Sequence, residues 1–292
     1  MNTFRYDTSA RWFKGNTHIH SVISDGHLDF QQLADLYTGA GYDFLFRTDH
    51  WIASDVKADP LEYPLLWLDG IELDGKDGRE NYFHIVCLGS FEGIDRSMGL
   101  EKALQAVRAQ GGLVILAHPH WTGNRLEDAL NLPLDGVEVY NNVCQNMNGK
   151  GYAGPLWDGL LDAHRNLLAI ASDDAHLGSD DPGWNGGWIV VNAAERSRDS
   201  IFRAIRAGNF YASTGPEFIT VEHQAGRIHV RTSPVKYIRL VGPAYRCEKI
   251  IDPHGCGLAE AEFEVPSDWK TVYIQIEDDV RRLAWTNPLF RD

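Results

Sequence analysis

Up to about residue 215 the chain alternates short apolar runs with amphipathic stretches, and this alternation limits the folds open to it. Apolar residues at helical spacing predict helices in 28–41, 99–112, 154–166 and 197–209, each followed by a strand-like segment. Repeated strand–helix units of this kind are typical of an α/β fold with a largely parallel sheet. We therefore expect a barrel or an open α/β sheet.

Beyond Pro216 the pattern changes. The stretches RIHVRT and TVYIQIED alternate apolar and polar residues, and no convincing helix lies between them. We predict a barrel domain at residues 1–217 and a small, all-β, sandwich-like domain at 218–292. The second domain carries no chemical cluster, which favours a packing or oligomerisation role and leaves a homo-oligomer open.

Charge and composition restrict the partners. The formal charge of −14 argues against sequence-independent binding to duplex nucleic acid, and favours a small-molecule substrate. No run reaches the roughly 20 apolar residues of a membrane span, and the first residues lack the apolar core of a signal peptide. The four cysteines are too few for a disulfide framework. We expect a cytoplasmic protein without a membrane partner.

The segment NTHIHSVISDG places His18 and His20 on what reads as the first strand. Residues i and i+2 of an extended segment point to the same face, so the two imidazoles converge as metal ligands would. The alternative is a pair of surface histidines on an edge strand.

Other candidate ligands lie close to the predicted strands. The carboxyl ends of such strands form the edge where α/β proteins build their active sites, so these side chains should line one cavity. Each alone has an ordinary explanation as a core or turn residue, but so many together fit two or three divalent ions. Ligation by imidazole and carboxylate suits zinc, manganese or iron. The residues are His50, Glu72, His84, His118, Asp174 and His176.

The order His-x-His, Asp-Gly, Thr-Asp-His, Gly-x-Glu, His, Ala-His-Pro and Ser-Asp-x-Ala-His resembles the PHP family (polymerase and histidinol phosphatase), over about residues 14–216. The resemblance implies a distorted seven-stranded (β/α) barrel, similar to a TIM barrel, that holds up to three metals and hydrolyses phosphate esters. The segments 204–218 and 281–290 resemble a branch related to carbaryl hydrolase, in which a β domain follows the barrel.

The resemblance also implies a ligand set. Some members have histidine where this chain has Asp25, and Asp174 is preferred over Asp173 because its spacing to His176 matches the family motif. The first ion would take His18, His20, Glu72 and Asp174, the second Glu72, His84 and His118, and the third Asp25, His50 and His176.

The sequence thus predicts a metal-dependent phosphoesterase that uses a metal-bridging hydroxide, with Glu72, His118, His176 and Asp25 as catalytic residues. Two alternatives stay open. One is hydrolysis of a carbamate or amide ester by the same metals, and the other is a metal-stabilised binding domain without turnover.

Three side chains near the motifs are candidates for substrate binding: Arg47, His120 and Arg125. An arginine can bind a phosphate or carboxylate in bidentate fashion, but it can equally be a salt-bridge partner. Strand alternation would point Arg47 away from His50. Glu138 is expected beside the metals rather than on them, and the loop 178–188 is either a lid or a packed loop.

Overall fold

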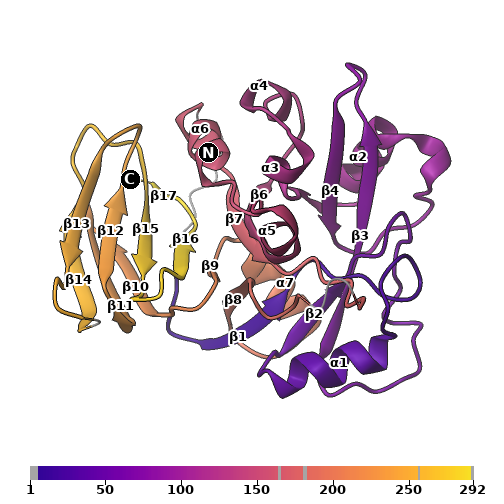
Figure 1. Ribbon diagram of the computed structural model, residues 1–292, viewed down its shortest axis with the longest axis horizontal. Helices are drawn as coiled ribbons and strands as arrows, with labels where there is room; N and C mark the ends of the chain where they lie inside the picture. The colour runs from indigo at the N-terminus through magenta and orange to yellow at the C-terminus, as the bar shows by residue number, and fades with distance from the viewer. Residues whose placement is uncertain (1–5, 164–165, 180–182, 256, 291–292) are drawn as a thin grey trace.

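The computed structural model describes residues 6–163, 166–179, 183–255 and 257–290. Figure 1 shows a larger lobe that holds the helices and a smaller lobe built from strands of the C-terminal part. Among the described residues, no helix is long and apolar enough to cross a membrane.

The described strands before Pro216 are short, apart from one long hairpin. They are β1 (Arg11–Asn16), β2 (Phe44–Arg47), β3 (Leu66–Lys76), β4 (Tyr82–Leu88), β5 (Leu113–Leu116), β6 (Gly136–Asn141), β7 (Leu168–Ser172), β8 (Trp188–Ala193) and β9 (Phe210–Ser213).

The four predicted helices are confirmed as α1, α2, α6 and α7, although residues 164–165 of the third prediction lie outside the described chain. Local capping explains where two of them begin. Asp29 and Gln32 form a capping box at α1, and the Ser197 side chain caps α7. The helical segments are α1 (Phe30–Gly39), η1 (Arg96–Met98), α2 (Leu100–Ala109), α3 (Pro119–Thr122), α4 (Leu126–Ala129), α5 (Asn142–Asn148), α6 (Gly154–Asp162) and α7 (Arg198–Arg206).

The α/β class is confirmed, but the sheet is less regular than predicted. Strands β1, β2 and β3 are parallel, as are β5, β6 and β7, whereas β4 runs antiparallel to both of its neighbours. In the described chain β7 and β1 share no ladder, and a single parallel bridge from Ile19 to Ala175 connects the segments that follow them. A regular seven-stranded barrel is therefore not confirmed.

The C-terminal part forms two antiparallel sheets, with strand order β10-β11-β14 in one and β13-β12-β15-β16 in the other. Apolar side chains such as Val230, Ile238 and Phe263 fill the core of this region. The second sheet continues into the larger lobe, because β16 pairs with β9. The strands are β10 (Phe218–Gln224), β11 (Arg227–Val235), β12 (Tyr237–Val241), β13 (Cys247–Ile251), β14 (Leu258–Glu264), β15 (Thr271–Glu277), β16 (Leu283–Thr286) and β17 (Leu289–Phe290).

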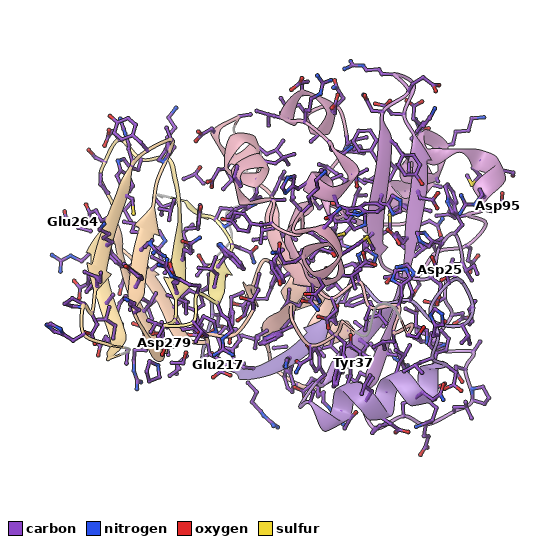
Figure 2. All side chains as sticks on the ribbon, in the orientation of Figure 1. Asp25, Tyr37, Asp95, Glu217, Glu264 and Asp279 are labelled. Carbon is purple, nitrogen blue, oxygen red and sulfur yellow. The ribbon has the colours of Figure 1, made fainter. Side chains whose placement is uncertain are left out.

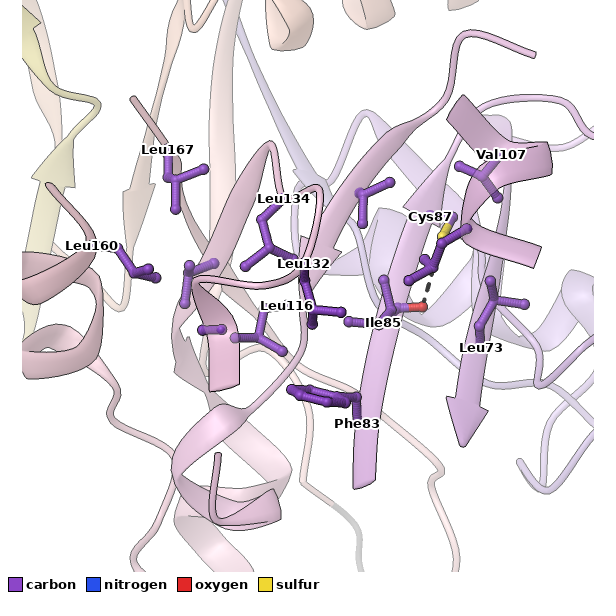
Figure 3. Close-up of a cluster of buried hydrophobic side chains, with 14 of the residues drawn as sticks. Leu73, Phe83, Ile85, Cys87, Val107, Leu116, Leu132, Leu134, Leu160 and Leu167 are labelled. Atoms are coloured by element: carbon purple, nitrogen blue, oxygen red, sulfur yellow. Dashed lines mark hydrogen bonds between the residues drawn. The ribbon is translucent and has the colours of Figure 1, made fainter. Parts of the chain in front are cut away.

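The largest apolar cluster supports the β3–β4 hairpin. Figure 3 shows Leu73, Ile85 and Leu116, from three neighbouring strands, gathered with Val107 of α2. Side chains alternate along a strand, so a hairpin whose Leu73 faces this cluster presents Glu72 to the opposite side. The hairpin is thereby a rigid support for polar side chains.

Candidate metal centre

His18 and His20 lie in the extended segment just past β1 and not within the strand, which corrects their predicted placement. Ile19 between them bridges Ala175, and its backbone N–H and C=O both bond the Thr48 hydroxyl at 2.9 Å. This extended backbone turns both imidazoles to one side, as predicted, with their Nε2 atoms 3.2 Å apart.

Four buried side chains form the innermost group: His18, His20, Glu72 and Asp174. Glu72 Oε2 lies 3.2 Å from His18 Nε2 and 3.1 Å from His20 Nε2. Asp174 Oδ1 lies 3.1 Å from each of the same two nitrogens. Two carboxylates and two imidazoles that face one point could hold a divalent metal ion.

A second group shares His20 and lies nearer to solvent. Asp25 Oδ1 is 3.3 Å from His20 Nδ1, and Asp25 Oδ2 is 3.4 Å from His176 Nε2 and 3.7 Å from His50 Nε2. The rings of His20 and His176 stack with their centroids 4.2 Å apart. Figure 2 shows Asp25 in the larger lobe, far from Glu264 of the C-terminal sheets. The three residues expected at the third ion are therefore together, with His20 beside them.

A third group contains His50, Glu72 and His84. His84 Nδ1 lies 2.7 Å from Glu72 Oε1, and His50 Nδ1 lies 3.3 Å from Glu72 Oε2. His118, expected here with Glu72 and His84, is slightly farther away, since its Nε2 lies 3.7 Å from Glu72 Oε1 and 3.6 Å from Asp174 Oδ2. It borders both this group and the innermost one.

The antiparallel hairpin explains how Glu72 and His84 meet. In the register of β3 and β4, Asp74 pairs with His84, and Glu72 lies two residues before Asp74 on the same face. His84 therefore lies near the start of its strand, whereas the sequence-based reasoning relied on carboxyl ends. Because β4 runs antiparallel to β3 and β5, the start of β4 lies at the same edge of the sheet as the carboxyl ends of those two strands.

Two buried atoms at the centre have no hydrogen-bond partner among the residues that the structure describes: Glu72 Oε2 and His50 Nδ1. Imidazole nitrogens surround that oxygen at 3.1–3.3 Å without aiming a hydrogen at it. Buried polar atoms are rarely left without a partner. Nitrogen and oxygen atoms that lie close together without a hydrogen between them are what a shared cation would require of its ligands. The residues present thus fit a divalent metal ion.

The electrostatics of the buried group fit the same assignment. Burial alone would lower the pKa of His18, but the charges of Asp174, Glu72 and Glu138 outweigh burial and raise that pKa well above its ordinary value. Burial would raise the pKa of Glu72, but the charge of His18 and the other imidazoles close to its carboxylate lower that pKa well below its ordinary value. Protons on the imidazoles balance the carboxylates, and a metal ion would displace those protons.

Glu138, the residue expected beside the metals, is fully buried under the innermost group. Its Oε1 accepts hydrogen bonds from His18 Nδ1 at 2.8 Å and from the Ser172 hydroxyl at 2.6 Å. Its Oε2 accepts from the backbone N–H of His118 and from the Asn141 amide, both at 2.9 Å. With its Nδ1 bound to Glu138, His18 presents its Nε2 to the centre.

Asp49 is a supporting residue that the sequence analysis missed. It is buried, and its carboxylate accepts hydrogen bonds from the backbone N–H and hydroxyl groups of both Ser21 and Ser24. Those bonds fix the turn that carries Asp25. Its place directly before His50 in the Thr-Asp-His motif is the one signal that could have found it.

Asp173 has a different role from its neighbour Asp174. It is buried and accepts hydrogen bonds from the Tyr37 hydroxyl and from the backbone N–H groups of residues 185–187. Trp184 of the same loop packs edge-on against Tyr37. The described part of this loop is thus held by packing, and residues 180–182 lie outside the described chain.

Three residues at the centre have strained backbone angles. Trp51, His118 and Asp174 adopt positive φ angles of 56°, 26° and 56°. Residues with side chains seldom take such angles, and they persist where the surroundings impose them, which is common at functional sites.

A cavity of about 410 Å³ opens beside the cluster. Among the described residues it is lined by Ser24, Asp25, His50, Asp74, Tyr82, His84 and Arg96. None of the three side chains predicted to bind substrate is in that lining.

Arg47 is buried, forms an ion pair with Asp59 and lies 3.8 Å from the centroid of the Phe30 ring. Strand alternation turns it away from His50, and it lies outside the described lining of the cavity.

The other two predicted substrate residues also have local partners. His120 Nδ1 lies 3.2 Å from the carbonyl oxygen of Tyr152. The exposed Arg125 pairs with Glu127 and Asp128. Both side chains lie outside the described lining of the cavity. Loop contacts of this kind leave no periodic signal in a sequence, so the sequence could not predict them.

Comparison with known proteins bears on the fold. No protein-family model and no curated protein matches the chain. A two-domain protein from Bacteroides vulgatus, which contains a predicted PHP-like metal-dependent phosphoesterase, superposes over 98% of this chain and 97% of its own, with a TM-score of 0.53 and 16% identity. This chain has the same two-domain fold.

Two other solved structures are similar over part of the chain. A candidate metal-dependent phosphoesterase from Bifidobacterium adolescentis covers 58% of this chain and 90% of its own, at 18% identity and a TM-score of 0.42. An amidohydrolase from Chromobacterium violaceum, with bound sulfate and no metal, covers 67% and 96%, at 18% identity and a TM-score of 0.46. The expected resemblance of the fold to PHP-like proteins is confirmed by the Bacteroides structure alone, and the chemistry has to be argued from the residues of this chain.

Proposed function

We propose that the protein is a metal-dependent hydrolase that cleaves a phosphate ester of a small molecule. The observation that carries this proposal is the buried set of His18, His20, Glu72 and Asp174, with the unpaired Glu72 Oε2 at its centre and an open cavity beside it. Such a set gives a hydrolase a fixed place for cations next to a substrate.

The ligand assignment within this proposal has three parts. The innermost group holds one ion, the group around Asp25 holds another, and Glu72 with His84 and a flanking histidine holds a third if three are bound. Zinc, manganese and iron all suit these donors. Within the same proposal the metal-binding domain covers residues 1–217 and forms the family's distorted barrel, and the β domain begins at 218.

Charge explains why this cavity needs cations for a phosphate ester. Asp25 and Asp74 line it and Glu72 lies under it, so the carboxylates alone would repel an anionic substrate. Divalent ions held there would attract the phosphoryl oxygens and make water a nucleophile at neutral pH. Glu72 and Asp25 would hold the metal ions at fixed points. His118 and His176 lie beside these carboxylates and Asp174, and imidazole nitrogens are suited to general acid–base catalysis.

The test is turnover by protein reconstituted with manganese, iron or zinc, using p-nitrophenyl phosphate, bis(p-nitrophenyl) phosphate and 1-naphthyl methylcarbamate. The proposal predicts release of nitrophenol from a phosphate ester. His20→Gln should reduce that rate by about 100-fold or more, because it removes a donor shared by two groups.

His229→Gln is the matched control, since His229 pairs with Glu260 on the C-terminal sheets, away from the cluster. Its rate should stay within about twofold of the wild type. If the protein hydrolysed the carbamate and neither phosphate ester, the proposed phosphoesterase activity would be wrong, and hydrolysis of a carbon-centred ester would take its place. Loss of neither activity in His20→Gln would contradict the proposed centre.

A further inference from the structure

The cavity beside the metal centre carries one permanent cation among its described lining residues, Arg96. It lies in the short helix η1, its side chain is 61% exposed, and its guanidinium group lies 5.4 Å from the centroid of the Trp51 ring. A substrate that enters the cavity therefore meets this side chain.

Asp74 fixes the guanidinium in place. Arg96 Nη1 donates to Asp74 Oδ2 at 3.0 Å and Nη2 donates to Asp74 Oδ1 at 2.8 Å. The Tyr82 hydroxyl also donates to Asp74 Oδ2, at 3.1 Å. A planar fork held at two points loses little freedom when it binds a further group.

The Asp74 carboxylate also lies between the Arg96 guanidinium and the metal centre. Asp74 Oδ1 lies 3.4 Å from His50 Nδ1, so one carboxyl group separates the guanidinium from a candidate ligand. The contact with Asp74 engages two of the five guanidinium N–H groups, and the described residues offer no acceptor to the other three.

We infer that Arg96 binds a second oxyanion of the substrate, a carboxylate or phosphate group across the cavity from the ester that is cleaved. This inference rests on the proposed function, and it makes the substrate class a phosphate ester with two anionic groups. Guanidinium is the side chain best suited to such a group, because its parallel N–H bonds match two oxygens.

Matched aryl phosphates test the inference on the metal-loaded protein. The probes are 4-carboxyphenyl phosphate, 4-phosphonophenyl phosphate and the neutral control 4-carbamoylphenyl phosphate. One charge-assisted contact should give the anionic probes a KM about tenfold lower than that of the control, and the better of the two identifies the favoured oxyanion.

Arg96→Gln should abolish this difference by raising the KM of the anionic probes, with kcat within about threefold and the metal content unchanged. Arg96→Lys should keep part of the difference, since it keeps the charge without the fork. Lys76→Gln is the control, because Lys76 lies on the same hairpin and pairs with the exposed Glu80. It should behave as the wild type does.

Calorimetry with the non-hydrolysable 4-carboxyphenylphosphonate and phenylphosphonate separates this inference from the proposed function. If no phosphate ester were turned over but Arg96 still favoured the carboxylated compound by about tenfold, the proposed reaction would fail and the anion site would stand. The inference would be overturned if the wild type bound the two compounds with the same affinity and Arg96→Gln did so too. Arg96 would then serve only to hold η1 against Asp74.

Discussion

Glu138 shows how a residue without direct access to the cavity can control the centre. Its two oxygens connect His18 with the backbone of His118, so one buried side chain orients parts of two groups. The sequence predicted Glu138 beside the metals because it lies near the active edge of a predicted strand, and the structure shows which atoms it holds.

Glu138→Gln is therefore expected to weaken metal binding. The amide can keep the size of the side chain but loses the charge that orients the His18 ring, and such partners typically change metal affinity by about 10- to 100-fold. Titration of the metal-free protein with the metal, followed by calorimetry, measures this affinity. An unchanged affinity would mean that Glu138 only fills space.

The pH dependence of the metal-free protein follows from His18 and His20. Their pKa values are raised above the ordinary 6.5, for although burial favours the neutral rings, the surrounding carboxylates outweigh burial. A raised pKa in the folded state stabilises the protein fully below the unfolded value, and this stability is lost as pH rises through the folded value.

We expect the Tm of chelator-treated protein to fall as pH increases from about 6 to about 9. Bound metal should remove most of this slope, because the imidazoles are then already deprotonated. Thermal unfolding at a series of pH values measures both. A Tm of the metal-free protein that rises over this range would contradict the raised pKa values.

At the scale of the elements, the turn after β1 is held by contacts between distant parts of the chain. Asp49 follows β2, yet its partners Ser21 and Ser24 precede α1. Spacing within a segment predicted which histidines converge, since alternation is local. It could not predict the role of Asp49 or the burial of Arg47 against Asp59, because the partners Ser21, Ser24 and Asp59 lie in loops whose conformation depends on tertiary contacts.

Asp49→Ala should accordingly loosen the turn that carries Asp25 while leaving the innermost group in place. We expect a loss of about 1–3 kcal/mol in the free energy of unfolding, from unsatisfied donors of Ser21 and Ser24. Metal should be lost only from the second group, the one around Asp25. Urea unfolding and metal analysis of the same preparation measure both, and loss of all metal would show that the two groups are not separable.

At the scale of the molecule, the two lobes are joined by more than a linker. β16 pairs with β9, and the buried Asn287 accepts a bond from the backbone N–H of Ala169 and donates to the carbonyl oxygens of Gly208 and Phe210. The pattern of the sequence changes near residue 216, and the antiparallel strand β10 begins at Phe218. That pattern carried no sign of this continuous sheet, which is made by pairs far apart in the chain.

We therefore expect both lobes to unfold together. Asn287→Ala should lower the free energy of unfolding by about 2–4 kcal/mol, through loss of buried hydrogen bonds, and the transition should stay single. Scanning calorimetry of the metal-loaded protein shows this directly. Two separate transitions in the wild type would contradict the coupling.

The measurement that tests the central claim most directly is the elemental analysis of purified, reconstituted protein, in moles of each transition metal per chain. We predict two or three ions per chain in the wild type, a clear loss in Glu72→Gln and no loss in His229→Gln. Metal near zero after reconstitution with manganese, iron and zinc, or an equal content in all three proteins, would contradict the assignment of this cluster as a metal centre.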